Sequence, residues 1–169
     1  MPRLRLLLHT LRRSFDGGAW HGPALADALV GVDADTALAR PFAGAHSIWD
    51  LTHHVAAWTR EVARRVAGAP PGLPAEGDWP APVTSTDPTE REAAWQLVRD
   101  ELTDARDMLL DVVAACPPDR LDERVGMAPG SALGAFVTFG EMLVGLAQHN
   151  AYHGGQIVLL RRAIAATRA

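Results

Sequence analysis

The sequence predicts an all-α protein, a four-helix bundle with a short additional helix near its N-terminus and two long loops. Three observations lead to this fold class. Apolar residues recur at helical spacing in four long segments. No segment has the alternation of apolar and polar residues that is typical of a half-buried strand. Glycine and proline gather between the helical segments. Since 169 residues fit one domain of ordinary size, we expect a single domain over residues 1–169.

The N-terminal part of the chain contains one long and one short predicted helix. The long helix covers residues 3–15 and is broken by the glycine-rich stretch "DGGAWHGP" (16–23). A short helix is expected near 24–32. This short element is the addition to the four main helices.

The second long helix begins at the stretch "HSIWD". Ser47 can cap this helix, and Asp50, three residues later, can complete a capping box. The helical pattern continues to about Ala67 and is followed by the proline-rich stretch 68–82, which predicts a long irregular loop.

The third and fourth long helices complete the bundle. The third covers about 88–115 and begins with acidic residues, which suit the positive end of the helix dipole. A second loop is expected over 116–134. In the stretch "TFGE", Thr138 and Glu141 form another capping box, and the fourth helix continues to about residue 166. Long helices joined by two long connections are typical of a helical bundle.

Composition and charge exclude several classes of function. The net charge is −4 and no dense run of basic residues occurs, so nucleic acid is not an expected partner. The apolar run near the N-terminus is short and interrupted by arginine, which argues against a signal peptide or a membrane span. The one cysteine, Cys116, cannot form an intramolecular disulfide. We therefore expect a cytoplasmic protein without a membrane partner.

Two histidines of the fourth helix face its apolar side. On an ideal helix, His153 lies within about 10° of the centre of the apolar stripe and His149 within about 50°. A buried imidazole without a hydrogen-bond partner costs on the order of 1–3 kcal/mol. Two such residues on adjacent turns therefore need a common explanation.

The second helix supplies a third histidine. His54 lies at the flank of that helix's apolar stripe, roughly 80° from its centre, whereas His53 falls on the opposite side, toward water. A helix packed beside the fourth one can therefore bring His54, but not His53, to His149 and His153.

Three imidazoles that converge from two helices predict a site for one divalent metal ion. Histidines at positions i and i+4 can place their nitrogens at the separation that zinc requires, and three protein ligands leave a coordination position open. All-histidine ligation suits zinc, nickel, copper or iron. The alternative is a set of core histidines satisfied by other hydrogen bonds. The zinc-protease motif His-Glu-x-x-His and the paired Glu-x-x-His motif of di-iron bundles are both missing from the sequence.

The segments "HSIWDLTHHVAAW" and "QHNAYHGGQIVLLRRA" resemble the DinB-like superfamily, also called the YfiT-like family of metal-dependent hydrolases. The stretch "AWHGPAL" (19–25) is similar to the N-terminal part of a common subgroup. In that family, a four-helix bundle carries one histidine ligand on its second helix, in the pattern apolar-x-x-His-apolar-Ala, and two on its fourth helix, in His-x-x-x-His. These patterns fall on His54 and on His149 and His153.

The resemblance implies zinc or nickel as the metal, and it implies an enzyme that activates a low-molecular-weight thiol, or water, for transfer to a small electrophile. Characterised relatives include thiol S-transferases and a thiol-dependent isomerase, and many relatives form homodimers. The alternative is a non-catalytic bundle in which the metal has a structural or stress-response role. Gln156 is the candidate catalytic residue, since it can bind a ligand or orient a water molecule. Asp50, one turn before His54, is a candidate hydrogen-bond acceptor for that histidine.

Overall fold

A computed structural model describes residues 2–81, 83–126 and 136–168 of the chain. All its regular elements are helical within these ranges, as the sequence predicts. The elements are α1 (Pro2–Asp16), α2 (Leu25–Leu29), α3 (Ala34–Leu38), α4 (Ile48–Val66), α5 (Pro88–Ala114), the 3-10 helix η1 (Pro118–Asp122) and α6 (Phe139–Arg168).

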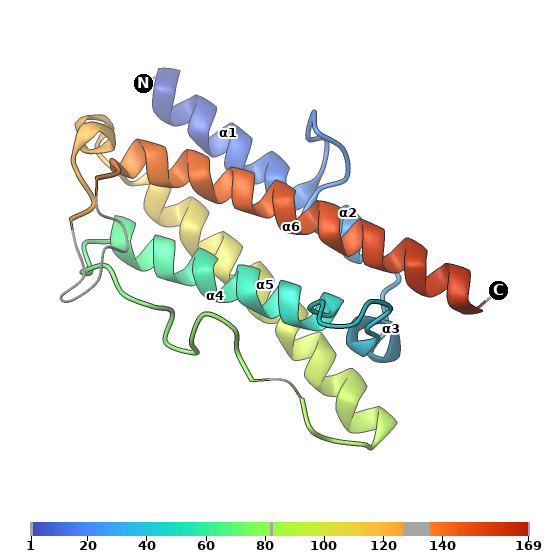
Figure 1. Cartoon of the computed structure of the whole chain (residues 1–169). Coiled ribbons are helices and arrows are strands. Elements are labelled where there is room, and N and C mark those ends of the chain that lie inside the picture. Colours follow the sequence, from blue (N-terminus) through green and yellow to red (C-terminus); the bar gives the residue numbers. More distant parts are fainter. Residues whose placement is uncertain (1, 82, 127–135, 169) are drawn as a thin grey trace.

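The four long helices form a bundle in which α1 and α6 run in one direction and α4 and α5 in the other (Figure 1). Each long helix packs against two of the others, so that α1, α6, α4 and α5 close a ring around the core. The short helices α2 and α3 cover the end of the bundle at which α4 begins (Figure 1). The parallel arrangement of α4 and α5 requires the long connection 67–87, which runs back along the outside of the bundle (Figure 1).

Both predicted capping boxes are formed. The Ser47 hydroxyl accepts a hydrogen bond from the Asp50 amide, and the Asp50 carboxylate accepts one from the Ser47 amide. At the start of α6, the Thr138 hydroxyl and the Glu141 carboxylate exchange the same two bonds. Each box satisfies amide groups that have no partner inside the helix, which fixes where α4 and α6 begin.

The structure departs from the sequence prediction in two connections. The predicted short helix 24–32 ends at Leu29, and a second short helix, α3, follows it. Asp33 caps α3 by accepting a hydrogen bond from the Thr36 amide at 2.8 Å. The predicted loop 116–134 contains η1, and its part from 127 to 134 lies outside the described residues.

The core of the bundle joins apolar residues from every helix. Its fully buried members include Leu11 of α1, Val55 of α4, Trp95 and Leu109 of α5, and Ile157 of α6. The Trp95 indole also donates a hydrogen bond of 2.8 Å to the Val32 carbonyl, which fastens the segment between α2 and α3 to α5. Burial of large side chains on this scale is the main source of stability for such a bundle.

None of the described helices combines the length and the apolarity that crossing a membrane requires.

Candidate metal centre

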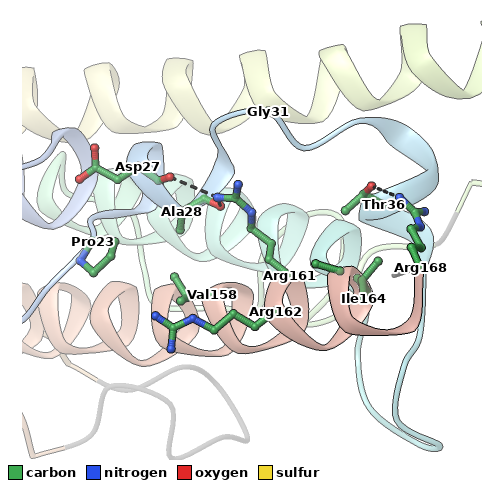
Figure 2. Close-up of a pocket in the computed structure, with 11 residues that line it drawn as sticks. Pro23, Asp27, Ala28, Gly31, Thr36, Val158, Arg161, Arg162, Ile164 and Arg168 are labelled. Carbon is green, nitrogen blue, oxygen red and sulfur yellow. Dashed lines mark hydrogen bonds between the residues drawn. The ribbon is translucent and has the colours of Figure 1, made fainter.

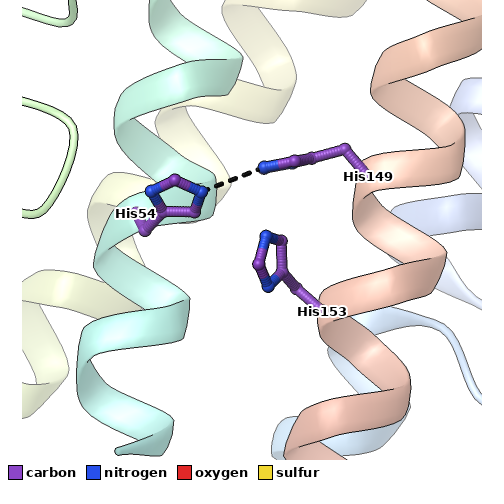
Figure 3. A group of neighbouring side chains, drawn as sticks. All are labelled: His54, His149 and His153. Atoms are coloured by element: carbon purple, nitrogen blue, oxygen red, sulfur yellow. Dashed lines mark hydrogen bonds between the residues drawn. The ribbon is translucent and has the colours of Figure 1, made fainter. Parts of the chain in front are cut away.

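The three predicted histidines lie together between α4 and α6. His54 projects from α4, and His149 and His153 project from successive turns of α6, so that the rings face one another across the groove between the helices (Figure 3). One nitrogen from each ring lies within 4.8 Å of one nitrogen of each other ring. The fold therefore brings together the three histidines that helical phase predicts.

The spacing of the nitrogens is close to what a small metal ion needs. The Nε2 atoms of His54 and His149 are 3.0 Å apart. Metal–nitrogen bonds of about 2.0–2.1 Å at tetrahedral angles would place two ligating nitrogens roughly 3.3 Å apart. No aspartate, glutamate or cysteine among the described residues joins this group.

Hydrogen bonds on the outer side of two rings fix which nitrogen faces the cluster. The Nδ1 atom of His54 lies 2.6 Å from the carbonyl oxygen of Asp78, and Nδ1 of His153 lies 2.7 Å from Oε1 of Gln156. A carbonyl oxygen can only accept a hydrogen bond, so each Nδ1 carries the proton. The Nε2 lone pairs of His54 and His153 are therefore left facing the cluster, which is how metal-binding histidines are usually held.

The third ring is held differently. Nδ1 of His149 is buried and has no hydrogen-bond partner among the described residues. Burial, followed by the neighbouring imidazoles of His153 and His54, lowers the pKa of His149 to about 3. Burial also lowers the pKa of His153, and the hydrogen bond with Gln156 only partly offsets this effect. Both rings are therefore neutral at physiological pH, which is the form that binds metals.

The connection between α4 and α5 supplies an aromatic wall beside the cluster. The ring of Trp79 is stacked between His46 and His54, with ring centroids 3.5 Å and 4.0 Å away. The preceding residue, Asp78, accepts a hydrogen bond of 2.7 Å from the Trp58 indole through its carboxylate. Asp78 and Trp79 together hold the His54 ring from its edge and from its face.

Two cavities lie beside the histidines. The first, which we call the Trp58 cavity, measures about 400 Å³ and is lined by His54 and His149 together with Trp58. The second, which we call the Trp79 cavity, measures about 350 Å³ and is lined by His153 together with Trp79. Both are within the size range of small-molecule sites.

A larger cavity than these two lies elsewhere in the described structure. It measures about 690 Å³ and is formed by the C-terminal part of α6 and the α2–α3 region (Figure 2). Arg161 and Arg168 donate hydrogen bonds there to the Ala28 carbonyl and the Thr36 hydroxyl. Its described lining contains no histidine or cysteine. Cavity size alone therefore does not point to the histidine cluster.

The other sequence predictions for this region have mixed outcomes. Trp58, one turn after His54 on α4, lines the cavity named after it. Asp50 does not reach His54, because its carboxylate is occupied by the Ser47 amide and by Arg40 at 2.6 Å. His53 points away from the cluster, as predicted, but it faces Glu101 of α5 at 3.2 Å and not open water.

Three neighbours of the cluster were not identified from the sequence. These residues are His46, Asp78 and Trp79, and all three lie in connections outside the helices. A helical-phase argument cannot place loop residues, so only the acidic and aromatic pair "DW" in a proline-rich loop hinted at them.

The described residues fit a metal ion better than they fit a set of satisfied core histidines. A satisfied set would engage every ring nitrogen with another group of the chain. Here Nε2 of His54 has only Nε2 of His149 as its partner, at 3.0 Å, and Nδ1 of His149 has no partner in the described chain. A neutral three-nitrogen donor set of this kind suits zinc, nickel, copper or iron.

Comparisons with known proteins support the same interpretation. A family model described as the DinB superfamily matches residues 19–157, a range that includes all three histidines. No curated protein and no solved structure matches the chain.

Proposed function

The chain belongs to the DinB superfamily, and from this premise we propose that it is a metal-dependent enzyme that transfers a low-molecular-weight thiol to a small electrophile. His54, His149 and His153 would hold one divalent ion, with zinc or nickel as the expected metal. Water in place of the thiol, and hence hydrolysis, is the second reaction that the same site could support.

The observation that carries the proposal is the inward orientation of two Nε2 lone pairs. The outer hydrogen bonds of His54 and His153 maintain this orientation in the structure. Three protein ligands leave at least one coordination position for a reactant, whereas purely structural zinc sites usually have four.

A divalent ion bound there would lower the pKa of a thiol or a water molecule placed at its open position. The residues of the chain then have defined tasks. Asp78 and Gln156 hold the His54 and His153 rings in their binding orientation. Trp79 shields one face of His54 from solvent. Gln156 also lines the Trp79 cavity, where its amide could contact a reactant, and we propose it as the residue closest to a catalytic role.

The thiol is preferred over water because the site offers little help to a general base. Among the described residues, Asp78 supplies the single carboxylate that lines either cavity beside the histidines. One of its oxygens already accepts a hydrogen bond from Trp58. A thiol ionises more readily than water and needs less assistance from a base.

The alternative function is a metal-stabilised bundle without catalysis. It is favoured by one observation, namely that the three histidines bridge α4 and α6, so a bound ion would cross-link two helices of the core.

Elemental analysis of purified variants tests the metal site. We expect His54→Ala, His149→Ala and His153→Ala each to lose most of the bound metal, since two histidines rarely hold a divalent ion tightly. His53→Ala is the matched control, because His53 is adjacent in sequence but faces Glu101, and it should retain the metal. Equal metal content in all four variants would remove the site.

Removal of the metal separates the two functions. A metal-free protein that keeps its circular dichroism spectrum but loses thiol-dependent turnover supports the enzyme. A metal-free protein that unfolds, together with no turnover by the loaded protein, supports the structural alternative.

A further inference from the structure

The two cavities beside the histidines lie at opposite ends of the cluster. Because α4 and α6 are antiparallel (Figure 1), early residues of α4 pair with late residues of α6. The Trp58 cavity uses residues 54–65 of α4 and 142–149 of α6. The Trp79 cavity uses Leu51 of α4 and residues 152–160 of α6. Their linings share no described residue, so the histidine cluster lies at the junction of two compartments.

The Trp79 cavity is suited to an uncharged reactant. Its wall is mainly apolar and includes Phe42, Leu51 and Leu159. Its polar side chains are imidazoles, a tyrosine hydroxyl and the Gln156 amide, and no aspartate, glutamate or arginine belongs to its described lining. An anionic reactant that entered this cavity would lose its hydration shell without gaining a cation as a partner. This desolvation costs free energy.

The Trp58 cavity differs because its lining includes the buried guanidinium of Arg65. The lining also contains the carboxylate of Asp78, which is half exposed to solvent and accepts a hydrogen bond from the Trp58 indole. Arg65 is 4% exposed, and its Nε and Nη2 atoms donate to the Glu61 carboxylate and the Gly72 carbonyl. Its Nη1 atom forms no hydrogen bond with a described residue, which leaves a donor for a carboxylate that enters the cavity. Arginine is well suited to bind a carboxylate in such a setting.

We propose that the two cavities bind the two reactants separately. An uncharged, apolar electrophile would occupy the Trp79 cavity, and a thiol that carries a carboxylate would occupy the Trp58 cavity, so that they meet at the histidines. This inference rests on the proposed thiol transfer. With benzyl chloride as the electrophile, a sulfur–carbon bond forms and the carbon–chlorine bond breaks. Chloride leaves with the electron pair, and the thiol proton passes to the buffer.

A matched pair of substitutions tests the assignment, since each adds one phenyl ring to one cavity. Ala45→Phe fills part of the Trp79 cavity, and Gly145→Phe fills part of the Trp58 cavity. A Cβ atom at Gly145 would meet no atom within 4 Å, so the new side chain has room at its base. Gly145→Ala is the control, because it adds the Cβ atom without filling the cavity. If Ala45→Phe does not fold, Leu159→Trp at the exposed rim of the same cavity replaces it.

Steady-state kinetics with N-acetylcysteine and benzyl chloride give the first readout. We expect Ala45→Phe to raise the KM for benzyl chloride roughly tenfold or more, and Gly145→Phe to do the same for N-acetylcysteine, with the other KM changing less than about twofold. The methyl ester of N-acetylcysteine, which lacks the charge, should bind the wild type roughly tenfold more weakly than the acid. Equal effects of each variant on both reactants, or the reverse pattern, would overturn the assignment.

Calorimetry with the zinc-loaded protein distinguishes this inference from the proposed function. Benzyl alcohol, an unreactive analogue of the electrophile, and N-acetylcysteine are titrated separately. If Ala45→Phe weakens the binding of benzyl alcohol alone and Gly145→Phe weakens the binding of N-acetylcysteine alone, the two compartments are supported even when no product forms. The absence of product then counts against the proposed transferase activity only. Failure of the wild type to bind either probe would overturn the inference.

Discussion

Two buried polar clusters involve α4, one beside the 67–87 connection and one between α4 and α6, and they differ in which of their polar atoms have partners in the chain. In the first, the Glu61 carboxylate accepts hydrogen bonds from Arg64, Arg65 and the Gly72 amide, while Arg65 also donates to the Gly72 carbonyl. In the second, around His54, the nitrogens that face inward have only one another as neighbours. In the first cluster both carboxylate oxygens of Glu61 have partners from the chain, whereas the second leaves Nδ1 of His149 without one among the described residues.

The difference teaches how to distinguish a structural lock from a binding site. Buried polar atoms in proteins are nearly always satisfied, because an unsatisfied atom costs free energy. The Glu61 cluster follows this rule and fastens the start of the 67–87 connection to α4. The histidine cluster does not follow this rule, because its inward-facing nitrogens have only one another as partners. A bound metal ion would give these nitrogens a common partner. Both clusters are buried to a similar degree, so burial alone does not separate them.

The largest expected effect concerns the closed cluster. Glu61→Ala removes the partner of a buried guanidinium, and we expect the free energy of unfolding to fall by about 3–5 kcal/mol. Urea denaturation measures the change, and Glu61→Gln, which can still accept hydrogen bonds, should lose less. The folded fraction should keep its metal, because Glu61 does not touch the histidines. An unchanged free energy of unfolding would mean that the Glu61 cluster does not stabilise the fold.

The sequence was sufficient for the helical parts of both the fold and the site. The Ser47–Asp50 and Thr138–Glu141 boxes fixed two helix starts, and helical phase brought His54 to the α6 pair. These features depend on local spacing, which a sequence displays directly.

The parts that the sequence did not predict depend on long-range contacts. Asp78 and Trp79 reach His54 only because the 67–87 connection runs back along α4, and the Glu61–Gly72 contact directs that path. Asp50 was a poor candidate because Arg40, from the preceding loop, occupies its carboxylate. The helix α3 was missed because five residues are too few for a periodic pattern.

The open cluster should also respond to acid. His149 has its pKa lowered to about 3 in the folded protein, whereas the unfolded chain takes up the proton near 6.5. Between these values the unfolded state binds more protons, so the stability of the metal-free protein falls as the pH falls through this window. The lowered pKa of His153 acts in the same direction.

We expect His149 alone to account for a loss of about 2 kcal/mol between pH 7 and pH 5. Urea denaturation of the metal-free protein at several pH values measures the loss. His149→Leu serves as the matched control, since it should remove this contribution while leaving the other titrating groups in place. A pH profile that is the same in the wild type and in this variant would show that the ring is not held in its neutral form.

The smallest expected effect is a change in stability that has the opposite sign to the change at Glu61. His149→Leu replaces a ring whose buried Nδ1 has no partner in the described chain, and the new side chain would lie beside Met142 and Leu146, which line the same cavity. The substitution also removes the 3.0 Å contact between Nε2 of His149 and Nε2 of His54, which offsets part of the gain. At pH 7.5, where the ring is neutral, we expect the metal-free variant to be more stable than the metal-free wild type by about 1 kcal/mol. Thermal unfolding after treatment with a chelator measures this gain, and elemental analysis of the untreated variant should find the metal lost.

Substitution at Glu61 weakens the fold and spares the metal, whereas substitution at His149 strengthens the fold and removes the metal. If His149→Leu instead destabilises the metal-free protein as strongly as Glu61→Ala does, the histidine cluster is a second lock, and the case for a reactive site loses its physical basis.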